Sequence, residues 1–180
     1  MIIENIYNYD YQTEISPFTG RGIIIDTSVL EIIFDGIILT KISKKKADEL
    51  DKLLGVFDII KVDWNKFYIT PHILTEACNH FKNKHNKKGC DYKKIVKEIF
   101  PIIQKIVEKS VEKDKIISYI DLDDPVIEVG DISIFAVADD YIQKKEKIAI
   151  LVNDRGVNDR YASDPRVMIL DYKSIIINAP

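Results

Sequence analysis

RGIIIDTSVL, residues 21–30, is the stretch that decides the fold of this chain. Its three consecutive isoleucines are typical of a short strand buried on both faces, as the strands of a parallel sheet are. Asp26 follows that strand directly, and ligands of open α/β sheets bind beyond the carboxyl ends of the strands. An aspartate here is equally suited to cap the helix that follows. The stretch predicts a central parallel strand and leaves Asp26 with two open roles, a functional carboxylate or a helix cap.

Strand and helix patterns alternate along the rest of the chain. Strands are predicted at residues 67–69, 115–120, 148–152 and 167–170, and helices at residues 27–34, 43–54, 72–85, 91–112 and 131–145. We expect the fourth helix to kink or divide at Pro101, which cannot donate an interior hydrogen bond. Because such alternation is typical of parallel sheets with right-handed crossovers, it predicts an α/β fold. The expected architecture is a three-layer α/β/α sandwich with a mostly parallel central sheet.

Length and composition favour one domain. With 180 residues, of which 46% are hydrophobic, the chain can bury one core and is too short for two ordinary domains. Residues 1–20 show no sustained period, so we expect an N-terminal extension at 1–20 and a single domain at 21–180. No apolar run approaches the roughly 20 residues of a membrane span, and the 2 cysteines are too few for a disulfide framework. We therefore expect a cytoplasmic protein that does not bind membranes.

Charge is distributed unevenly along the chain. The formal net charge of −3 argues against a surface coated with basic residues. Residues 82–115 nevertheless contain 11 basic and 5 acidic residues, whereas residues 121–140 contain 7 acidic residues and no basic one. One part of the surface is thus suited to a polyanion while another gathers carboxylates, although lysine-rich helices are also common as solvated faces.

Four acidic residues stand where the local pattern buries them or points them at the strand ends. Two of them follow buried strands, and two lie in the first turns of helices: in chain order they are Asp26, Glu76, Asp131 and Asp154. Because the carboxyl ends of parallel strands lie at one edge of the sheet, we expect the four to converge. Clustered carboxylates repel one another unless a cation neutralises them, and oxygen ligands suit Mg²⁺ or Mn²⁺ rather than zinc. Such an ion activates water for phosphodiester hydrolysis.

The same acids lie in four short motifs that resemble a known family. The motifs are III-Asp26-TSVL, ILT-Glu76-A, G-Asp131-ISIFA and ILVN-Asp154. In this order and spacing they resemble the PIN-domain ribonuclease family over residues 21–172. The resemblance implies an α/β/α fold whose acidic pocket binds Mg²⁺ or Mn²⁺ and cleaves RNA, leaving a 5′-phosphate.

Carried over position by position, the resemblance makes the four acids catalytic and metal-binding residues. Ser28 or Thr27 would supply a hydroxyl near the pocket, and we expect Asn153 and Arg155 to contact the substrate. Many small prokaryotic members of the family resemble toxins of type II toxin–antitoxin pairs. The expected partners are therefore RNA, a cognate antitoxin protein and a second copy of the chain in a homodimer.

Other hypotheses compete with this one. Val152 stands two residues before the last acid, where the family commonly has Thr or Ser; unless Asn153 substitutes, the chain would be a catalytically weak or inactive PIN-like module that binds RNA or protein. A haloacid-dehalogenase-like site would need an aspartate in place of Ser28, and a receiver domain would need paired acids near the first strand. A zinc site around His80 fits no standard ligand spacing.

Overall fold

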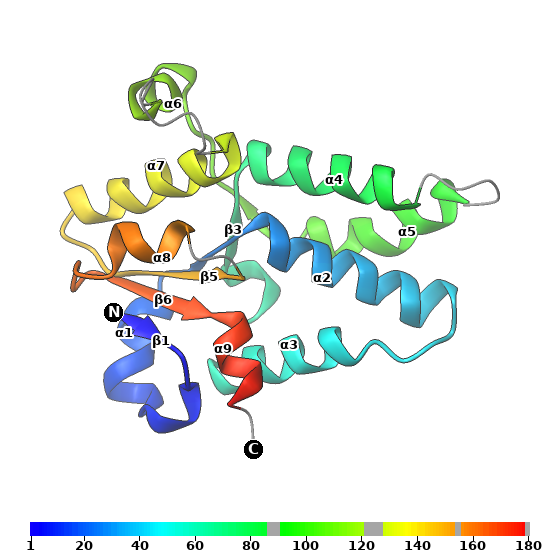
Figure 1. Ribbon diagram of the computed structural model, residues 1–180, viewed down its shortest axis with the longest axis horizontal. Coiled ribbons are helices and arrows are strands. Elements are labelled where there is room, and N and C mark those ends of the chain that lie inside the picture. Colours follow the sequence, from blue (N-terminus) through cyan, green and yellow to red (C-terminus); the bar gives the residue numbers. More distant parts are fainter. Residues whose placement is uncertain (86–90, 121–127, 154–155, 179–180) are drawn as a thin grey trace.

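The computed structural model describes residues 1–85, 91–120, 128–153 and 156–178. In this part of the chain six strands form one sheet, all of them parallel, in the order β1-β6-β5-β2-β3-β4 (Figure 1). The strands are β1 (Ile2–Ile3), β2 (Ile23–Ile25), β3 (Phe67–Ile69), β4 (Val107–Glu108), β5 (Ile148–Val152) and β6 (Val167–Asp171). The predicted α/β fold with a parallel central sheet is confirmed.

Helices flank this sheet. The α-helices are α1 (Ser16–Thr19), α2 (Thr27–Ile37), α3 (Asp48–Ile59), α4 (Pro71–His85), α5 (Tyr92–Ile103), α6 (Lys113–Tyr119), α7 (Val129–Gln143), α8 (Gly156–Tyr161) and α9 (Tyr172–Ile177). Shorter 3₁₀ and π turns are η1 (Ile6–Asn8), η2 (Tyr11–Ile15), η3 (Ile38–Ile42) and η4 (Trp64–Lys66). Among the described helices none is both long and apolar enough to cross a membrane.

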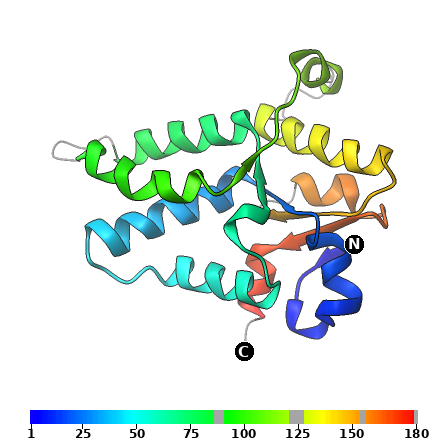
Figure 2. The same ribbon diagram turned by 180° about the vertical axis from the view of Figure 1, so that it is seen from behind.

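Successive residues of β3 show the two layers of helices. The ring of Phe67 contacts the ring of Phe57 from α3, with centroids 4.4 Å apart. The next residue, Tyr68, points to the opposite face, where its ring stacks against Tyr141 of α7. Figure 2 shows α7 and α8 on one side of the sheet and α3 on the other. Both faces of the central strands are therefore covered, as the unbroken apolar sequence of β2 predicts.

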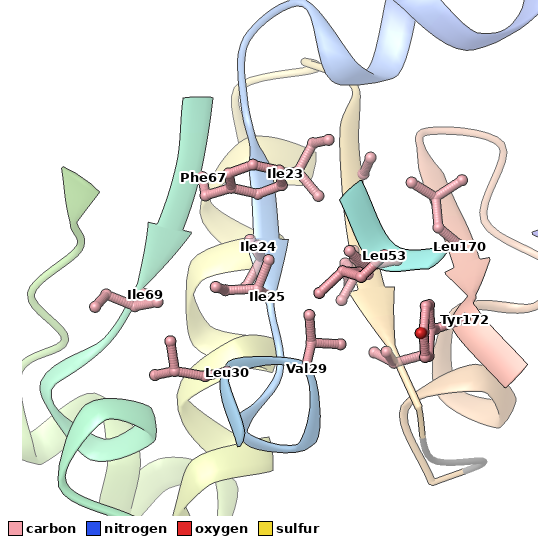
Figure 3. Close-up of a cluster of buried hydrophobic side chains, with 14 of the residues drawn as sticks. Ile23, Ile24, Ile25, Val29, Leu30, Leu53, Phe67, Ile69, Leu170 and Tyr172 are labelled. Carbon is pink, nitrogen blue, oxygen red and sulfur yellow. The ribbon is translucent and has the colours of Figure 1, made fainter. Parts of the chain in front are cut away.

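The core is built on the apolar runs of the central strands. Ile23, Ile24 and Ile25 of β2 are each 0% exposed, and all five residues of β5 are fully buried as well. Figure 3 shows the β2 side chains packed among those of β3, β6 and the first turn of α2. Burying such a side chain contributes about 1.5–3 kcal/mol, so these strands anchor the sheet.

The order of the strands fixes where a ligand would bind. From β2 the chain proceeds to β3 and β4 on one side, then returns to β5 and β6 on the other. The topological switch point therefore lies between β2 and β5, which pair in parallel with Ile25 opposite Leu151. In open α/β sheets the ligand crevice lies at the carboxyl ends of the strands at this point. Asp26 and Asn153 follow these two strand ends.

Residues 1–20, which we interpreted as an extension, contain a strand of the sheet. Ile3 in β1 pairs in parallel with Leu170 of β6. Ile3, Ile6 and Ile15 are at most 1% exposed and belong to the main core. The pairing of β1 with β6 has no local sequence signal, because the two strands lie at opposite ends of the chain.

One predicted strand is wrong, and one predicted helix is too long. Residues 115–120 were expected as a strand, but Lys113–Tyr119 forms helix α6, which buries Ile116 and leaves Ile117 exposed. The edge strand is instead β4, within the predicted helix of residues 91–112, since α5 ends at Ile103. Pro101 lies inside α5, close to its end. Short apolar runs fit either strand or helix, and here the contact of α6 with α7 decides.

Candidate functional site

Asp26 is buried at the carboxyl end of β2 and is held by its own neighbours. It is 7% exposed, and its backbone N–H donates to the Leu151 carbonyl of β5 at 3.1 Å. The Thr27 N–H donates to its Oδ1 at 2.5 Å, and the Ser28 hydroxyl donates to its Oδ2 at 2.6 Å. Asp26 is thus the N-cap of α2, one of the two roles left open by the sequence, and its carboxylate is also fixed at the switch point.

Glu76 reaches the same region from α4. The Thr27 hydroxyl donates to its Oε2 at 3.0 Å, which links α4 to the first turn of α2. Gly130, in the first turn of α7, lies against the same Oε2: a Cβ on Gly130 would overlap it and would lie 3.6 Å from Thr27 Oγ1. The carboxylate of Glu76 therefore lies where α2, α4 and α7 begin, and the missing side chain at Gly130 makes room for it.

Two buried hydroxyls hold the starts of α4 and α7 together. Thr70, at the end of β3, and Ser133, in α7, have their side-chain oxygens 2.6 Å apart. Ser133 donates to the Gly130 carbonyl at 2.6 Å, and Thr70 accepts from the Ile73 N–H at 3.2 Å. Because both hydroxyls are fully paired, this link carries little desolvation cost. The hydrogen bond from Ser133 fixes the position of Gly130, and the position of Gly130 determines the space that the Glu76 carboxylate can occupy.

The electrostatics around Glu76 differ from those of an ordinary surface carboxylate. Burial and the neighbouring carboxyl of Glu128 raise the pKa of Glu76 to about 7, while the Thr27 hydroxyl and His80 oppose the shift. Glu128 is the N-cap residue of α7, three positions before Asp131. Sequence reasoning missed Glu128. Its signal was present in the chain, because an acid at the start of the helix that carries Asp131 lies at the same edge as Asp131.

The other predicted site residues are only partly described. Asp131 lies in the first turn of α7 and is half-buried. Asp154 and Arg155 lie outside the described residues. In the residues that are described, no group of three or more His, Cys, Asp or Glu side chains is close enough to hold one metal ion. The convergence of all four acids therefore stays a prediction, and what is seen is Asp26 beside the Thr27–Glu76–Glu128 contacts.

Asn153 has an unusual environment at the end of β5. Its Oδ1 is buried and accepts no hydrogen bond from any described residue. A buried amide oxygen without a partner costs about 1–3 kcal/mol, so such an atom is normally satisfied by water, an ion or a ligand. Val152, where the family commonly has a hydroxyl, is 0% exposed and pairs with Asp171 of β6.

Other acids and histidines near the site are engaged elsewhere. Asp139 accepts hydrogen bonds from the hydroxyls of Tyr119 and Tyr161 at 2.6 and 2.8 Å and pairs with Arg160 at 3.3 Å. These contacts join α6, α7 and α8. His80 Nδ1 lies 2.5 Å from Glu31 Oε1 of α2, in a pair on the surface. Neither residue belongs to a metal cluster in the described part of the chain.

Comparisons of the chain with protein-family models, with curated proteins and with solved structures find no match. The described residues establish an α/β fold with a six-stranded parallel sheet. The PIN resemblance rests on the four sequence motifs.

Proposed function

We propose that this chain is a divalent-metal-dependent endoribonuclease of the PIN type. The observation that carries the proposal is the position of Asp26. A carboxylate that is 7% exposed lies at the end of the central strand, beside the switch point, with both oxygens oriented by hydrogen bonds. A helix cap alone needs neither the burial nor the Ser28 contact, because Asn, Ser and Thr cap as well in exposed positions.

Two features support a hard divalent ion at this edge. Asn153 Oδ1 is a buried oxygen with no hydrogen-bond partner among the described residues, and the Glu76 carboxylate fills a space that a side chain at residue 130 would close. Mg²⁺ keeps several waters and is commonly held by one or two carboxylates together with substrate phosphate oxygens. A complete protein cage is therefore not required, and Asp26, Asp131, Asp154 and Glu76 remain the proposed ligands.

Bound there, Mg²⁺ or Mn²⁺ would supply an activated water and neutralise the charge of the phosphoryl oxygens. The chain's own residues prepare that chemistry. Thr27 N–H and Ser28 Oγ orient the Asp26 carboxylate, as outer hydrogen bonds orient a metal ligand. Without a bound ion, burial and the Glu128 carboxyl raise the pKa of Glu76 to about 7, and a cation beside it would lower that pKa and favour the ionised form that binds metal.

To bind RNA, the protein needs a basic surface in addition to the cleavage site. Three lysines on α5, at positions 93, 94 and 97, are exposed, and they lie in the basic segment of the sequence. Such side chains bind the phosphate backbone without reading sequence, and their contribution weakens as salt rises. A single-stranded or looped RNA, whose backbone enters a narrow pocket readily, is the proposed substrate.

The test is cleavage of mixed cellular RNA by the purified chain with Mg²⁺ or Mn²⁺, against EDTA and against Asp26→Asn. The matched control is Asp171→Asn, because Asp171 ends the neighbouring strand β6 and caps α9 by accepting from the Ser174 N–H at 3.0 Å. We expect cleavage to need metal, to fall at least 100-fold in Asp26→Asn and to survive in Asp171→Asn. Metal-independent cleavage, or equal loss in both variants, would contradict the mechanism.

A non-catalytic PIN-like module that binds RNA or protein is the second candidate. The burial of Val152 favours it, because a residue that is 0% exposed in the sheet supplies no polar group to a substrate. Such a module would bind RNA without cleaving it in any of these metal conditions. A toxin role has its own test: expression of the chain should arrest growth, and Asp26→Asn should relieve that arrest.

A further inference from the structure

A polar cavity of about 360 Å³ lies on the face of the sheet that α7 covers. It is lined by Tyr68 of β3, by Lys109 directly after β4, and by Tyr141 and Lys144 at the end of α7. Tyr141 is ten residues beyond Asp131, which is about 15 Å along an α-helix. The cavity is therefore separate from the carboxylate edge, and its volume falls in the range of roughly 300–1,000 Å³ that holds small organic ligands.

The charges of this cavity favour an anion. Its two acids are already paired: Glu146 with Arg21 at 2.9 Å, and Asp140 with Lys115 of α6. Lys109 and Lys144, by contrast, form no ion pair with any described residue. Two ammonium groups that have no carboxylate partner among the described residues suit a ligand group of charge near −2, such as a phosphomonoester.

The aromatic side chains favour a planar ring beside that phosphate. The rings of Tyr68 and Tyr141 stack with centroids 6.3 Å apart and planes 24° apart. Lys109 Nζ lies 4.1 Å from the centre of the Tyr68 ring and 5.8 Å from that of Tyr141. Burial raises the pKa of the Tyr68 hydroxyl, so the phenol stays neutral and does not repel an anion. Aromatic faces next to lysine ammonium groups are the elements that bind bases together with phosphates.

We infer that this cavity binds a nucleoside monophosphate, with the phosphate on Lys109 and Lys144 and the base against the two tyrosines. Such a group is supplied by a free nucleotide or by the 5′-phosphorylated end of an RNA. Inorganic phosphate is far smaller than the cavity, and a sugar phosphate has no planar ring to contact the two tyrosines that line it. The site does not depend on the proposed ribonuclease activity.

The test is calorimetric titration of the full chain with AMP, adenosine, ribose 5-phosphate and a 5′-phosphorylated trinucleotide RNA, all in EDTA so that no metal bridges phosphate to the carboxylate edge. We expect AMP to bind at least tenfold more tightly than adenosine or ribose 5-phosphate. The affinity of the trinucleotide relative to AMP then tells the end of an RNA from a free nucleotide.

The variant is the double change Lys109→Gln and Lys144→Gln, both on side chains that reach solvent. The matched control is Lys145→Gln, the exposed residue next to Lys144 that does not line the cavity. We expect at least a tenfold loss of AMP affinity in the double variant and less than a twofold change in the control. Absence of AMP binding, equal binding by the double variant, or equal affinity for ribose 5-phosphate would overturn the assignment.

Discussion

Gly130→Ala gives a direct test of the site's geometry, because its effect should change sign with the residue at position 76. In the wild-type chain a Cβ on Gly130 would overlap Glu76 Oε2, whereas the nearest atom of any other described residue, Thr27 Oγ1, is 3.6 Å away, at ordinary contact distance. The backbone of Gly130 is helical, so alanine suits it. Among the described residues the Glu76 carboxylate is therefore the obstacle to the new methyl group, and it lies at the end of a flexible side chain that can move.

The magnitude follows from two opposing terms. Moving Glu76 breaks the hydrogen bond from Thr27, and a bond to a charged group contributes about 1.5–3 kcal/mol. Alanine in place of glycine in a helix gains up to about 1 kcal/mol. We expect Gly130→Ala to destabilise the wild-type chain by about 1 kcal/mol. In the Glu76→Ala chain the obstacle is gone, and the same change should stabilise by about 0.5–1 kcal/mol.

The assay is urea unfolding of the four chains of this double-mutant cycle at pH 8, where Glu76 is ionised. Gly55→Ala is the matched control: a Cβ on Gly55, in α3, meets no atom of a described residue within 4 Å, so it should stabilise both backgrounds equally by about 0.5–1 kcal/mol. The same effect of Gly130→Ala in both backgrounds would refute the contact between Gly130 and Glu76, and with it the site's arrangement.

Three further predictions test other parts of the molecule. The Glu76 pKa of about 7 exceeds its ordinary 4.5, so the folded state binds more protons than the unfolded state between these values. Stability to urea should therefore fall as pH rises through that window, by about 1 kcal/mol after allowance for solvent screening, and Glu76→Gln should abolish the slope. Ile3→Ala should cost about 2–4 kcal/mol of unfolding free energy, because Ile3 is 0% exposed; a cost below about 0.5 kcal/mol would mean that residues 1–20 add nothing to the fold. Asp139→Asn should cost about 1–3 kcal/mol in thermal unfolding, because it weakens the acceptor of the Tyr119 and Tyr161 hydroxyls, and an unchanged melting temperature would contradict that network.

The central part of the fold could be predicted because its signals are local. The isoleucines of β2 and the residues of β5 form unbroken apolar runs, and such runs followed by helical patterns are typical of a parallel sheet. The edges could not be predicted in this way. Both β1 and β4 are two residues long, and β1 is held by a partner at the other end of the chain. Neither strand has enough residues to show a period.

The candidate site likewise has features that the local sequence predicts and contacts that only the folded structure reveals. That Asp26 follows a buried strand is visible in the sequence, and the structure adds its partners, Thr27 N–H and Ser28 Oγ. The contact of Glu76 with Thr27 joins residues 49 positions apart, so only the packing of α2 on α4 reveals it. Glu128 was missed for a different reason: the helix was predicted to begin at Asp131, which left Glu128 in the preceding loop, whereas α7 begins at Val129 with Glu128 as its N-cap, close enough to Glu76 to raise the pKa of that carboxyl.

The sequence leaves capping and catalysis as alternative roles for Asp26, and in the proposed ribonuclease the cap would also serve the catalytic role. A carboxylate that serves a metal must keep one orientation while substrate and water exchange around it. The Thr27 N–H and the Ser28 hydroxyl each hold one oxygen of Asp26, and both belong to the helix that Asp26 caps. The cap thus removes the rotational freedom that a ligand on a flexible side chain would lose on binding. Ser28→Ala removes the bond to Oδ2 and leaves the Thr27 cap intact. We expect urea unfolding to show a loss of about 1.5–3 kcal/mol, and calorimetric titration of the folded variant to show Mg²⁺ binding at least tenfold weaker. Unchanged Mg²⁺ affinity in the folded variant would mean that Asp26 serves the fold alone.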